Sequence, residues 1–400
     1  MRILIADKLA DFVVHSLEGL GFAVFMDPSL KDDALLSEMQ SIDPHILIVR
    51  STKVKAEHIT SSNSLSLIIR AGAGVNTIDT ETASDYGIYV ANCPGQNAIA
   101  VAELAIGHLI NLDRKISDNV ASLREGQWKK KRFTKNAKGL YGKTIAVIGT
   151  GSCGQELIRR VKALGMNVRA WSRSLTESQA RQLGVEFSSS PLDACRGSDA
   201  LSVHLAFNAH TEGIIGEAEL EALNPGAYVI NTSRGGIIDE DALSKAIERR
   251  GLLAGLDVFV GEPASDGDFQ SPITQNPSVY GTHHIGASTE QASDAVGAAV
   301  VDIIHVWQQE GYVKNCVNLA EKSPADHLIS IRHVDKVGVL AFILEAIREC
   351  DHNIQEMENI IFKGGRAACA QIQIVGKPSE EMLSKIKSSE DIFSVSFNTI

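Results

Sequence analysis

Three polar side chains near the ends of short apolar runs form a set that could move a proton beside a bound anion. They are Arg234 in INTSRGGIIDEDAL, Glu262 in LDVFVGEP and His284 in VYGTHHIGAST. An arginine can hold a carboxylate and polarise a carbonyl, a histidine can exchange a proton with a hydroxyl, and a carboxylate can hold the imidazole and stabilise its charged form. Together they fit hydride transfer from a 2-hydroxy acid, although each residue alone is more often structural.

A glycine-rich segment predicts a dinucleotide site. In AVIGTGSCGQELIRRVKALGMNVRAW, Gly149, Gly151 and Gly154 stand between a predicted strand and a predicted helix. The first glycine permits a tight turn, the second lets the backbone approach a pyrophosphate, and the third lets helix and strand pack closely, while the helix N-terminus attracts negative charge. The residues predicted to contact the cofactor here and at a later strand end are Gly149, Thr150, Gly151, Ser152, Cys153, Gly154 and Thr232.

The end of the next predicted strand, AWSRS, bears on which nicotinamide cofactor binds. An acidic residue there would hydrogen-bond the ribose 2′-hydroxyl of NAD, but Ser172 stands at that position and Arg173 follows. A hydroxyl and a guanidinium suit the 2′-phosphate of NADP better than an acid would. The alternative is that Arg173 is only a solvent-facing loop cation, so NAD and NADP both stay open.

The elements that must position these residues alternate between short apolar runs and helical patterns. This alternation predicts an α/β fold with two Rossmann-like, doubly wound parallel-sheet domains, in which polar residues at the strand ends meet at one edge. Strands are predicted at 2–6, 22–26, 46–50, 67–69 and 88–91, and then at 144–148, 167–171, 200–205, 227–232, 256–260 and 278–282.

Two helices stand out within this alternation. The stretch over 98–116 is apolar on more than one face, which predicts a helix between two bodies or at an oligomer contact. The stretch over 240–250 shows both of its ends. Asp239 is a candidate N-cap, acidic residues fill the first turn, arginines fill the last, and Gly251 follows.

The composition changes after residue 316. Residues 317–326 carry charge, Ser and Pro without periodicity and are predicted to form a linker. Beyond them the pattern predicts a β-α-β-β-α-β domain over 327–400, with strands in HLISIRH, at 359–362, in AACAQIQIV and in FSVSFNT. Its core is thin for independent stability, so pairing with another copy is physically reasonable.

The composition also argues against several partners. The chain has 49 acidic and 38 basic side chains, a formal net charge of -11, which repels phosphate backbones and anionic lipid. We therefore expect no nucleic-acid and no membrane partner, and we interpret the basic run over 129–135 as a solvated stretch. The six cysteines show no metal-like spacing, and no export segment or membrane span is visible. These features predict a cytoplasmic protein without a metal site.

Several motifs resemble those of the D-isomer-specific 2-hydroxyacid dehydrogenases: GTGSCG, NTSRGGIIDEDAL, GLDVFVGEP and THHIGAST. The resemblance covers essentially residues 1–316. It implies that Arg234 binds the substrate carboxylate, that Glu262 pairs with the catalytic histidine, and that Asp257 lies by the nicotinamide. The family's usual form is PHIG, so His284 is the implied acid–base residue and His283 replaces a proline. His283 is then an idle loop residue or a charge that tunes its neighbour.

The resemblance also implies an arrangement of domains that the linear pattern does not show. Residues 1–97 and 289–316 would form a substrate-binding domain, and residues 98–288 would form an NAD-binding domain inserted into it. The active site would lie in the cleft between these two domains. Closure of that cleft would exclude water from the hydride path.

Within the family, the likeness is greatest to members that oxidise 3-phospho-D-glycerate to 3-phosphohydroxypyruvate, the first step of serine biosynthesis. VRSTKV resembles their phosphate-proximal segment, so Arg50 and Ser51 are candidate ligands of a phosphorylated hydroxy acid. IRAGAGVNTID and NCPGQNAIAVAE add Ala73, Gly74 and Asn97 as candidate substrate contacts. Two alternatives stay open: a glyoxylate or hydroxypyruvate reductase, and a non-enzymatic, cofactor-sensing corepressor.

The C-terminal unit resembles an ACT domain, a small module that senses amino acids. RHVDKVGVL is similar to its HxxxPGVL pattern with Val337 in place of proline, and His333 and Asn353 fall where some family members bind serine. Asp335 stands where an asparagine is usual, and its carboxylate would meet the carboxylate of serine. Serine feedback and a purely dimerising module therefore both stay open, and the resemblance implies a homodimer or homotetramer.

Overall fold

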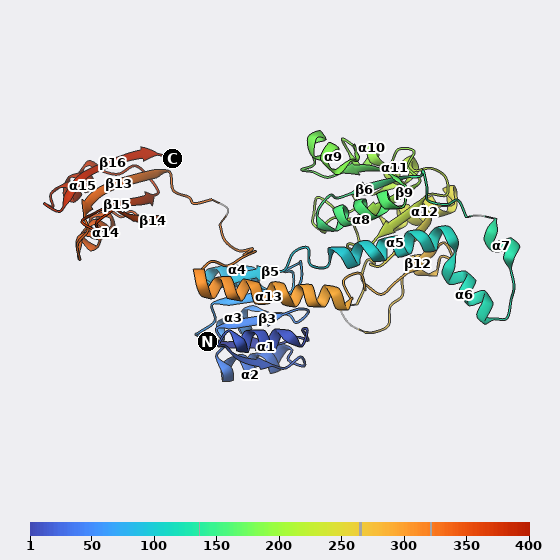
Figure 1. The fold of residues 1–400 in the computed structure, drawn as a ribbon, viewed down its shortest axis with the longest axis horizontal. Coiled ribbons are helices and arrows are strands. Elements are labelled where there is room, and N and C mark those ends of the chain that lie inside the picture. Colours follow the sequence, from blue (N-terminus) through green and yellow to red (C-terminus); the bar gives the residue numbers. More distant parts are fainter. Residues whose placement is uncertain (136, 264–265, 321) are drawn as a thin grey trace. The chain divides into compact units, whose positions relative to one another are not determined.

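The chain forms two compact units in a computed structural model that describes residues 1–135, 137–263, 266–320 and 322–400. The larger unit is Met1–Asn318 and the smaller unit is Leu319–Ile400 (Figure 1). The predicted linker contains Glu321, and the predicted cofactor domain contains Asn136, Ala264 and Ser265; these four residues lie outside the described ranges. No helix within those ranges is long and apolar enough to cross a membrane.

A parallel five-stranded sheet forms the N-terminal part of the larger unit, in the order β2-β1-β3-β4-β5. The apolar runs of the inner strands are buried on both faces, as helices on both sides of a parallel sheet require. Its elements are β1 (Arg2–Ile5), α1 (Phe12–Gly19), β2 (Ala23–Met26), α2 (Asp32–Ile42), β3 (Ile46–Val49), α3 (Ala56–Thr60), β4 (Leu67–Arg70), α4 (Thr80–Asp85) and β5 (Tyr89–Asn92). All five predicted strands are confirmed.

The long helix α13 (Glu290–Glu310) packs on this first sheet although it follows the second sheet in sequence. Its residues Val300, Ile303 and Ile304 belong to the same core cluster as Ile3 and Ile5. Figure 1 shows α13, in orange, beside the blue N-terminal elements. The chain therefore leaves the first sheet after β5 and returns to it at α13.

A seven-stranded parallel sheet forms the rest of the larger unit, in the order β12-β11-β10-β9-β6-β7-β8. Its strands are β6 (Thr144–Ile148), β7 (Asn167–Trp171), β8 (Glu186–Phe187), β9 (Ala200–Val203), β10 (Tyr228–Asn231), β11 (Leu253–Leu256) and β12 (Val279–Gly281). The accompanying helices are α5 (Ala98–Arg114), α6 (Ile116–Arg124), α7 (Lys130–Thr134), α8 (Ser152–Ala163), α9 (Glu177–Leu183), α10 (Pro191–Cys195), α11 (Glu217–Ala222), α12 (Glu240–Arg250) and the 3₁₀ turn η1 (Pro272–Gln275).

Each sheet has one switch point, where the strand order reverses. It lies between β1 and β3 in the first sheet and between β6 and β9 in the second. In doubly wound sheets, ligands bind outside the carboxyl ends of the strands at such a point. The two switch points are therefore the first places to look for a functional site.

Two helix predictions had different outcomes. The ends of α12 are confirmed: the Asp239 side chain accepts from the amide of Ala242, and Gly251 closes the helix in the left-handed conformation. The single helix predicted over 98–116 is wrong at its end. Lys115 has φ +52°, so α5 stops at Arg114 and α6 starts in a new direction.

The strand predicted at 256–260 is also wrong. The strand at this place is β11, LAGL, and Asp257 follows its carboxyl end. The apolar run LDVFV favoured a strand three residues too late. The true strand contains Gly255, which a propensity for strands does not favour but which the direct packing of α5 on β11 requires. A Cβ on Gly255 would lie 2.7 Å from the Cβ of His108.

The smaller unit is a four-stranded antiparallel sheet with two helices, in the order β14-β15-β13-β16. Its elements are β13 (His327–Val334), α14 (Val339–Glu349), β14 (Ile354–Ile361), β15 (Ala367–Ile374), α15 (Glu380–Lys387) and β16 (Ile392–Thr399). The predicted β-α-β-β-α-β order is confirmed. β14 begins earlier than predicted, because it extends along most of β15.

Candidate active site

The glycine-rich loop between β6 and α8 excludes side chains at two of its three glycines. Gly149 has φ +100°, and a Cβ there would lie 2.2 Å from the carbonyl oxygen of His204. A Cβ on Gly154 would lie 1.9 Å from the carbonyl oxygen of Gly149. A Cβ on Gly151 would meet no described atom within 4 Å. The loop, with Thr150 half-buried in it, thus packs tightly at both ends and leaves open space at its middle.

The N-terminus of α8 gives this loop an anion-binding character. Its N-cap is Gly151, and no described side chain caps the helix, so the amides of its first turn carry the positive end of the helix dipole. Burial raises the pKa of the Cys153 thiol, and the opposing charge of Arg234 does not offset it, so Cys153 stays neutral at pH 7. Open space beside an uncapped helix start, formed by Ser152 to Gly154, fits the pyrophosphate of a dinucleotide.

The two residues considered for the cofactor ribose directly follow β7. Ser172 is half-buried, and Arg173 is exposed in a turn closed by the Leu175 amide on the Ser172 carbonyl oxygen. The end of the second strand is where the ribose of a dinucleotide binds in this fold. Ser172 and Arg173 therefore lie at the predicted position.

The loop after β10 presents Arg234 through hydrogen bonds made by its neighbours. The Asn231 side chain accepts from the amide and the hydroxyl of Ser233, both at 3.0 Å, and donates to the carbonyl oxygen of Arg234 at 2.8 Å. The Arg234 guanidinium is exposed. Thr232 is buried, and its hydroxyl has no partner among the described residues, which leaves it available to a bound molecule.

His284 and Glu262 form a hydrogen-bonded pair through Nδ1 and Oε1. Glu262 Oε2 also accepts from the amide of Phe259 at 2.9 Å. Burial raises the pKa of Glu262, but the hydrogen bonds from His284 and Phe259 and the charges of His284 and Arg234 outweigh burial and hold this pKa below its ordinary value. Glu262 is therefore ionised at pH 7. Its bond to Nδ1 leaves Nε2 of His284, whose side chain is 45% exposed, to exchange a proton.

Asp257 is fully buried and supports the turn that carries His284. Its Oδ1 accepts from the amide of Ile285 at 2.9 Å, and its Oδ2 accepts from the amide of Gly286 at 2.8 Å. The amide of His284 donates to the Asp257 carbonyl oxygen at 2.8 Å. The resemblance implied a contact of Asp257 with the nicotinamide, and here its carboxylate meets the backbone of the turn. His283 is exposed, and its side chain makes no hydrogen bond within the described ranges.

Asp7, at the end of β1, organises the loop after β3. Its Oδ2 accepts from the amides of Arg50 at 2.7 Å, Ser51 at 3.1 Å and Thr52 at 3.0 Å, and its Oδ1 accepts from the Ser51 hydroxyl at 2.8 Å. Burial raises the pKa of Asp7, but these hydrogen bonds outweigh it and hold the pKa below its ordinary value. Arg50 is half-buried, and its guanidinium makes no hydrogen bond or ion pair within the described ranges, which leaves it available to an anion.

Arg70, at the end of β4, lies close to Arg50 and was not among the predicted site residues. Its Nε donates to the carbonyl oxygen of Arg50 at 3.0 Å. Burial, and then the positive charges of Arg234 and Arg50, hold the pKa of Arg70 below its ordinary value. Arg70 is therefore close enough to Arg50 and Arg234 to feel both positive charges, and guanidinium groups are well suited to bind carboxylate and phosphate. The signal in the sequence was the position of Arg70 at the end of a predicted strand, on the same sheet edge as Arg50.

The other predicted substrate contacts lie in loops that follow β4 and β5. The carbonyl oxygen of Ala73 accepts from the Asn92 side chain at 2.6 Å, and a Cβ on Gly74 would lie 3.2 Å from the Asn76 side-chain oxygen. Asn97 is the N-cap residue of α5, and its side chain makes no capping hydrogen bond among the described residues. The Asn97 amide is therefore free for another partner.

The three candidate effector residues have different surroundings within the smaller unit. His333 is buried, with Nδ1 2.7 Å from the Val334 carbonyl oxygen and Nε2 3.1 Å from the Asn359 side-chain oxygen. Asp335 and Asn353 are exposed. Both ring nitrogens of His333 already have partners in a single chain, so a ligand would have to displace one of them.

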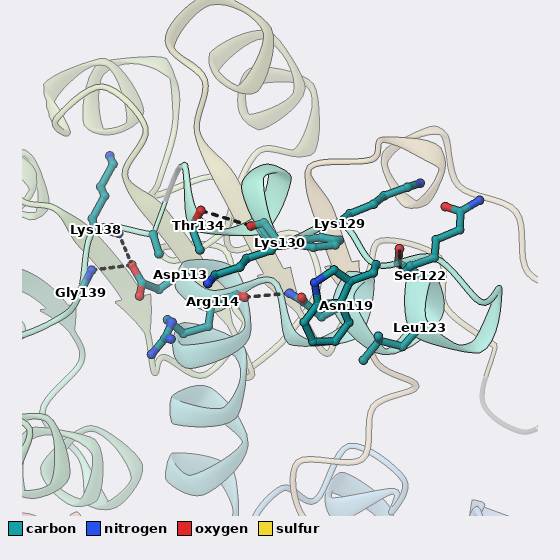
Figure 2. Close-up of a pocket in the computed structure, with 14 residues that line it drawn as sticks. Asp113, Arg114, Asn119, Ser122, Leu123, Lys129, Lys130, Thr134, Lys138 and Gly139 are labelled. Carbon is teal, nitrogen blue, oxygen red and sulfur yellow. Dashed lines mark hydrogen bonds between the residues drawn. The ribbon is translucent and has the colours of Figure 1, made fainter.

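A cavity of about 530 Å³ lies under the arm formed by α6 and α7. Figure 2 shows Lys129, Lys130 and Lys138 around it, with Asp113 accepting from the amides of Lys138 and Gly139. The predicted solvated stretch over 129–135 is thus partly helical and lines this cavity. None of the predicted catalytic, cofactor or substrate residues lines it, so the cavity is separate from the candidate active site.

The chain is similar to known dehydrogenases and reductases. A family model described as "D-isomer specific 2-hydroxyacid dehydrogenase, NAD binding domain" matches residues 106–286. A D-3-phosphoglycerate dehydrogenase of Methanocaldococcus jannaschii is 37% identical over 80% of this chain and 60% of its own length. A hydroxypyruvate reductase of Thermotoga maritima is 38% identical over 69% of this chain and 88% of its own length. A cofactor (NAD+)-bound 3-phosphoglycerate dehydrogenase structure from Entamoeba histolytica, 27% identical, matches with a TM-score of 0.64 over 80% of this chain and 99% of that one.

The chain belongs to the D-isomer-specific 2-hydroxyacid dehydrogenase family. Its cofactor is NAD, since the matched region contains the glycine-rich loop and is the NAD-binding domain of that family. The chain spans between 60% and 63% of the length of three phosphoglycerate dehydrogenases that it matches. The substrate must therefore be argued from the site.

Proposed function

We propose that this chain oxidises 3-phospho-D-glycerate to 3-phosphohydroxypyruvate with NAD, the first step of serine biosynthesis. The observation that carries the proposal is the position of Arg70, whose Nε donates to the carbonyl oxygen of Arg50 at 3.0 Å and whose pKa is lowered by burial and by the charges of Arg234 and Arg50. A substrate with a carboxylate at one end and a phosphate at the other supplies anions for these three arginines. Relatives named D-3-phosphoglycerate dehydrogenase support the same substrate.

The proposed reaction gives each side chain one task. Arg234 holds the substrate carboxylate and polarises the C2 oxygen as the carbonyl forms. His284 Nε2 accepts the proton of the 2-hydroxyl, and Glu262 stabilises the resulting imidazolium. Bound NAD supplies the acceptor for the hydride that leaves C2. Loss of one proton and one hydride converts the alcohol to the ketone.

We further propose that residues 98–288 form the NAD-binding domain and that residues 1–97 and 289–316 form the substrate-binding domain. The packing of α13 on the first sheet supports this division. Residues 317–326 would be the linker and 327–400 the regulatory domain. The proposed contacts to NAD are Gly149, Thr150, Gly151, Ser152, Cys153, Gly154, Ser172, Arg173 and Thr232, and those to substrate are Arg50, Ser51, Arg70, Ala73, Gly74, Asn97 and Arg234. Asp257 is left out of the first set, because it is fully buried and both of its side-chain oxygens accept from the turn that carries His284.

We propose a homodimer or homotetramer as the working assembly, in the cytoplasm. Exposed apolar side chains on the arm support an interface there, namely Ile116, Val120, Leu123 and Trp128, of which Trp128 is 82% exposed. All six cysteines are free, which fits a reducing compartment. Binding of serine as an effector by His333, Asp335 and Asn353 stays a prediction. Such binding would require a rearrangement of the hydrogen bonds around His333.

A hydroxypyruvate reductase is the second candidate. The chain covers 88% of the Thermotoga maritima enzyme of that name. Hydroxypyruvate has a carboxylate for Arg234 but no phosphate. If it were the substrate, Arg50 and Arg70 would have no anionic partner. For this reason we place it second.

A substrate panel tests the proposal. Purified protein is assayed with NAD and 3-phospho-D-glycerate, glycerate or lactate, and with NADH and hydroxypyruvate. We expect 3-phospho-D-glycerate to be oxidised far faster than the two unphosphorylated acids. Rapid reduction of hydroxypyruvate without activity on 3-phospho-D-glycerate would instead establish a reductase, and cofactor binding without any turnover would favour a corepressor.

The same assay with NADP tests Arg173. If Arg173 contributes to cofactor choice, Arg173→Ala will lower activity with NADP more than activity with NAD. An unchanged ratio between the two cofactors would show that Arg173 is only a loop cation.

A further inference from the structure

A chain of hydrogen bonds links helix α5 to the turn that carries His284, through His108 and Thr282. His108 Nε2 lies 3.1 Å from Thr282 Oγ1, and Thr282 Oγ1 lies 2.6 Å from Asp257 Oδ1. The Thr282 hydroxyl donates its one proton to Asp257 Oδ1, so it must accept from His108. His108 therefore carries its proton on Nε2. Burial lowers the pKa of His108, which fits a neutral ring in this role.

The Asp257 carboxylate, at one end of this series of hydrogen bonds, fixes the backbone of the turn that carries His284. Its two oxygens accept from the amides of Ile285 and Gly286 at 2.9 and 2.8 Å. His284 has φ +51°, a left-handed conformation that residues with a side chain rarely adopt unless their surroundings impose it. The position of Asp257 therefore affects the direction in which the imidazole leaves the backbone.

Helix α5 holds His108, which is the other end of this series of hydrogen bonds. Val101, Leu104 and His108 share one helix face at i, i+3 and i+7. A Cβ on Gly286 would lie 3.6 and 3.7 Å from the side chains of Val101 and Leu104, so this face packs on the turn. A Cβ on Gly255 would lie 2.7 Å from the Cβ of His108, so the buried His108 ring is held against β11.

We propose that Thr282 and His108 are positioning residues, which act through Asp257 to keep His284 in line with Glu262. The proposal rests on the acid–base role of His284 in the proposed function. Neither side chain has to touch the substrate. A loss of either would let the carboxylate and the turn shift, and a displacement of about 1 Å at a catalytic group can cost about 10²-fold in rate.

Matched substitutions test the kinetic consequence. Thr282→Val keeps the shape of the side chain and removes the hydroxyl, whereas Thr282→Ser keeps the hydroxyl. We expect Thr282→Val to lower kcat by about 10-fold to 100-fold, without raising KM or the dissociation constant of NAD, and we expect Thr282→Ser to restore most of kcat. At the other end, His108→Gln should retain more activity than His108→Leu, because an amide can still donate to Thr282.

A spectroscopic readout separates this proposal from the proposed function. The proton between His284 Nδ1 and Glu262 should give a low-field proton resonance in ¹⁵N-histidine-labelled protein, which is assigned by its absence in His284→Asn. We expect the signal in wild type and Thr282→Ser, and its loss or broadening in Thr282→Val and His108→Leu. An unchanged signal with unchanged kcat in folded Thr282→Val and His108→Leu would overturn the proposal. If no 2-hydroxy acid is turned over by wild type, the proposed function fails, and the resonance alone still decides whether Thr282 and His108 position His284.

Discussion

The two switch points of the larger unit use different groups to meet an anion. Between β6 and β9, no described side chain caps the amides at the start of α8, and a Cβ on Gly151 would meet no described atom within 4 Å. Between β1 and β3, Asp7 takes the amides of Arg50, Ser51 and Thr52. We therefore propose that the same topology gives a backbone site for an anion in one sheet and a side-chain site, formed by guanidinium groups, in the other.

The two kinds of site differ in how a substitution would alter the ligand that they bind. A site made of backbone amides depends on the absence of side chains, so a single added methyl group can block it. A site made of guanidinium groups depends on the identity of a few residues, so its preference for an anion can change by substitution. A pyrophosphate would suit the first kind of site, and the phosphate end of a hydroxy acid would suit the second.

The largest expected effect lies outside both anion sites, at His284. His284→Asn removes the group proposed to accept the hydroxyl proton, so kcat should fall by about 10²-fold to 10⁴-fold while NAD binding is retained. Steady-state kinetics and a fluorescence titration with NADH measure the two quantities. His283→Asn is the matched control, because His283 is adjacent and exposed. Equal loss in both variants would mean that the loop matters and not the Glu262 pair.

Gly151→Ala tests the backbone site. The added Cβ meets no described atom within 4 Å, so the fold should tolerate it, but it would stand where a pyrophosphate approaches. We expect the dissociation constant of NAD to rise about 10-fold to 100-fold with little change in Tm, on the scale of 1–3 kcal/mol for an overpacked contact. Gly149→Ala is the contrasting variant, because its Cβ would lie 2.2 Å from the His204 carbonyl oxygen and should destabilise the fold itself.

Arg50→Gln tests the side-chain site. A charge-assisted hydrogen bond contributes about 1.5–3 kcal/mol, so KM for 3-phospho-D-glycerate should rise by roughly 10-fold or more. KM for an unphosphorylated acid should hardly change. Lys53→Gln is the control, since Lys53 is an exposed cation in the same loop. The same increase for both substrates would contradict a phosphate contact at Arg50.

The sequence predicted features whose causes are local and missed those that depend on packing across the sheet. Asp239 and Gly251 mark the ends of α12 by their own hydrogen bond and backbone conformation, so its bounds were visible. β11 was misplaced because the packing of α5 on Gly255 is a long-range contact. The first sheet and the β-α-β-β-α-β unit were predictable from the alternation of apolar runs, whereas the two-residue edge strand β8 of the second sheet was missed.

The candidate site shows the same division. Arg234, Glu262 and His284 were visible as polar residues at strand ends, and the structure pairs His284, not His283, with Glu262. Asp7 and Arg70 were missed because their importance comes from neighbouring strands. Asp7 meets Arg50 only because β1 and β3 are adjacent, and this adjacency across 43 residues has no local signature.

Asp7→Asn has the smallest expected effect and tests why the two switch points differ. The pKa of Asp7 is lowered in the folded chain, so its ionised form stabilises the fold above the unfolded pKa of about 4, and this contribution disappears as pH falls through the folded value. Asparagine cannot accept with both side-chain atoms, so at pH 7 the variant should lose about 1–3 kcal/mol of unfolding free energy. Urea unfolding at several pH values should show the unfolding free energies of wild type and variant converging below about pH 4.

Asp11→Asn is the control, at an exposed carboxylate after the same strand, and its unfolding free energy should follow that of wild type at every pH. A constant difference between Asp7→Asn and wild type at all pH values would mean that the carboxylate charge does not hold the Arg50 loop, and the contrast between a backbone site and a side-chain site would then need another cause.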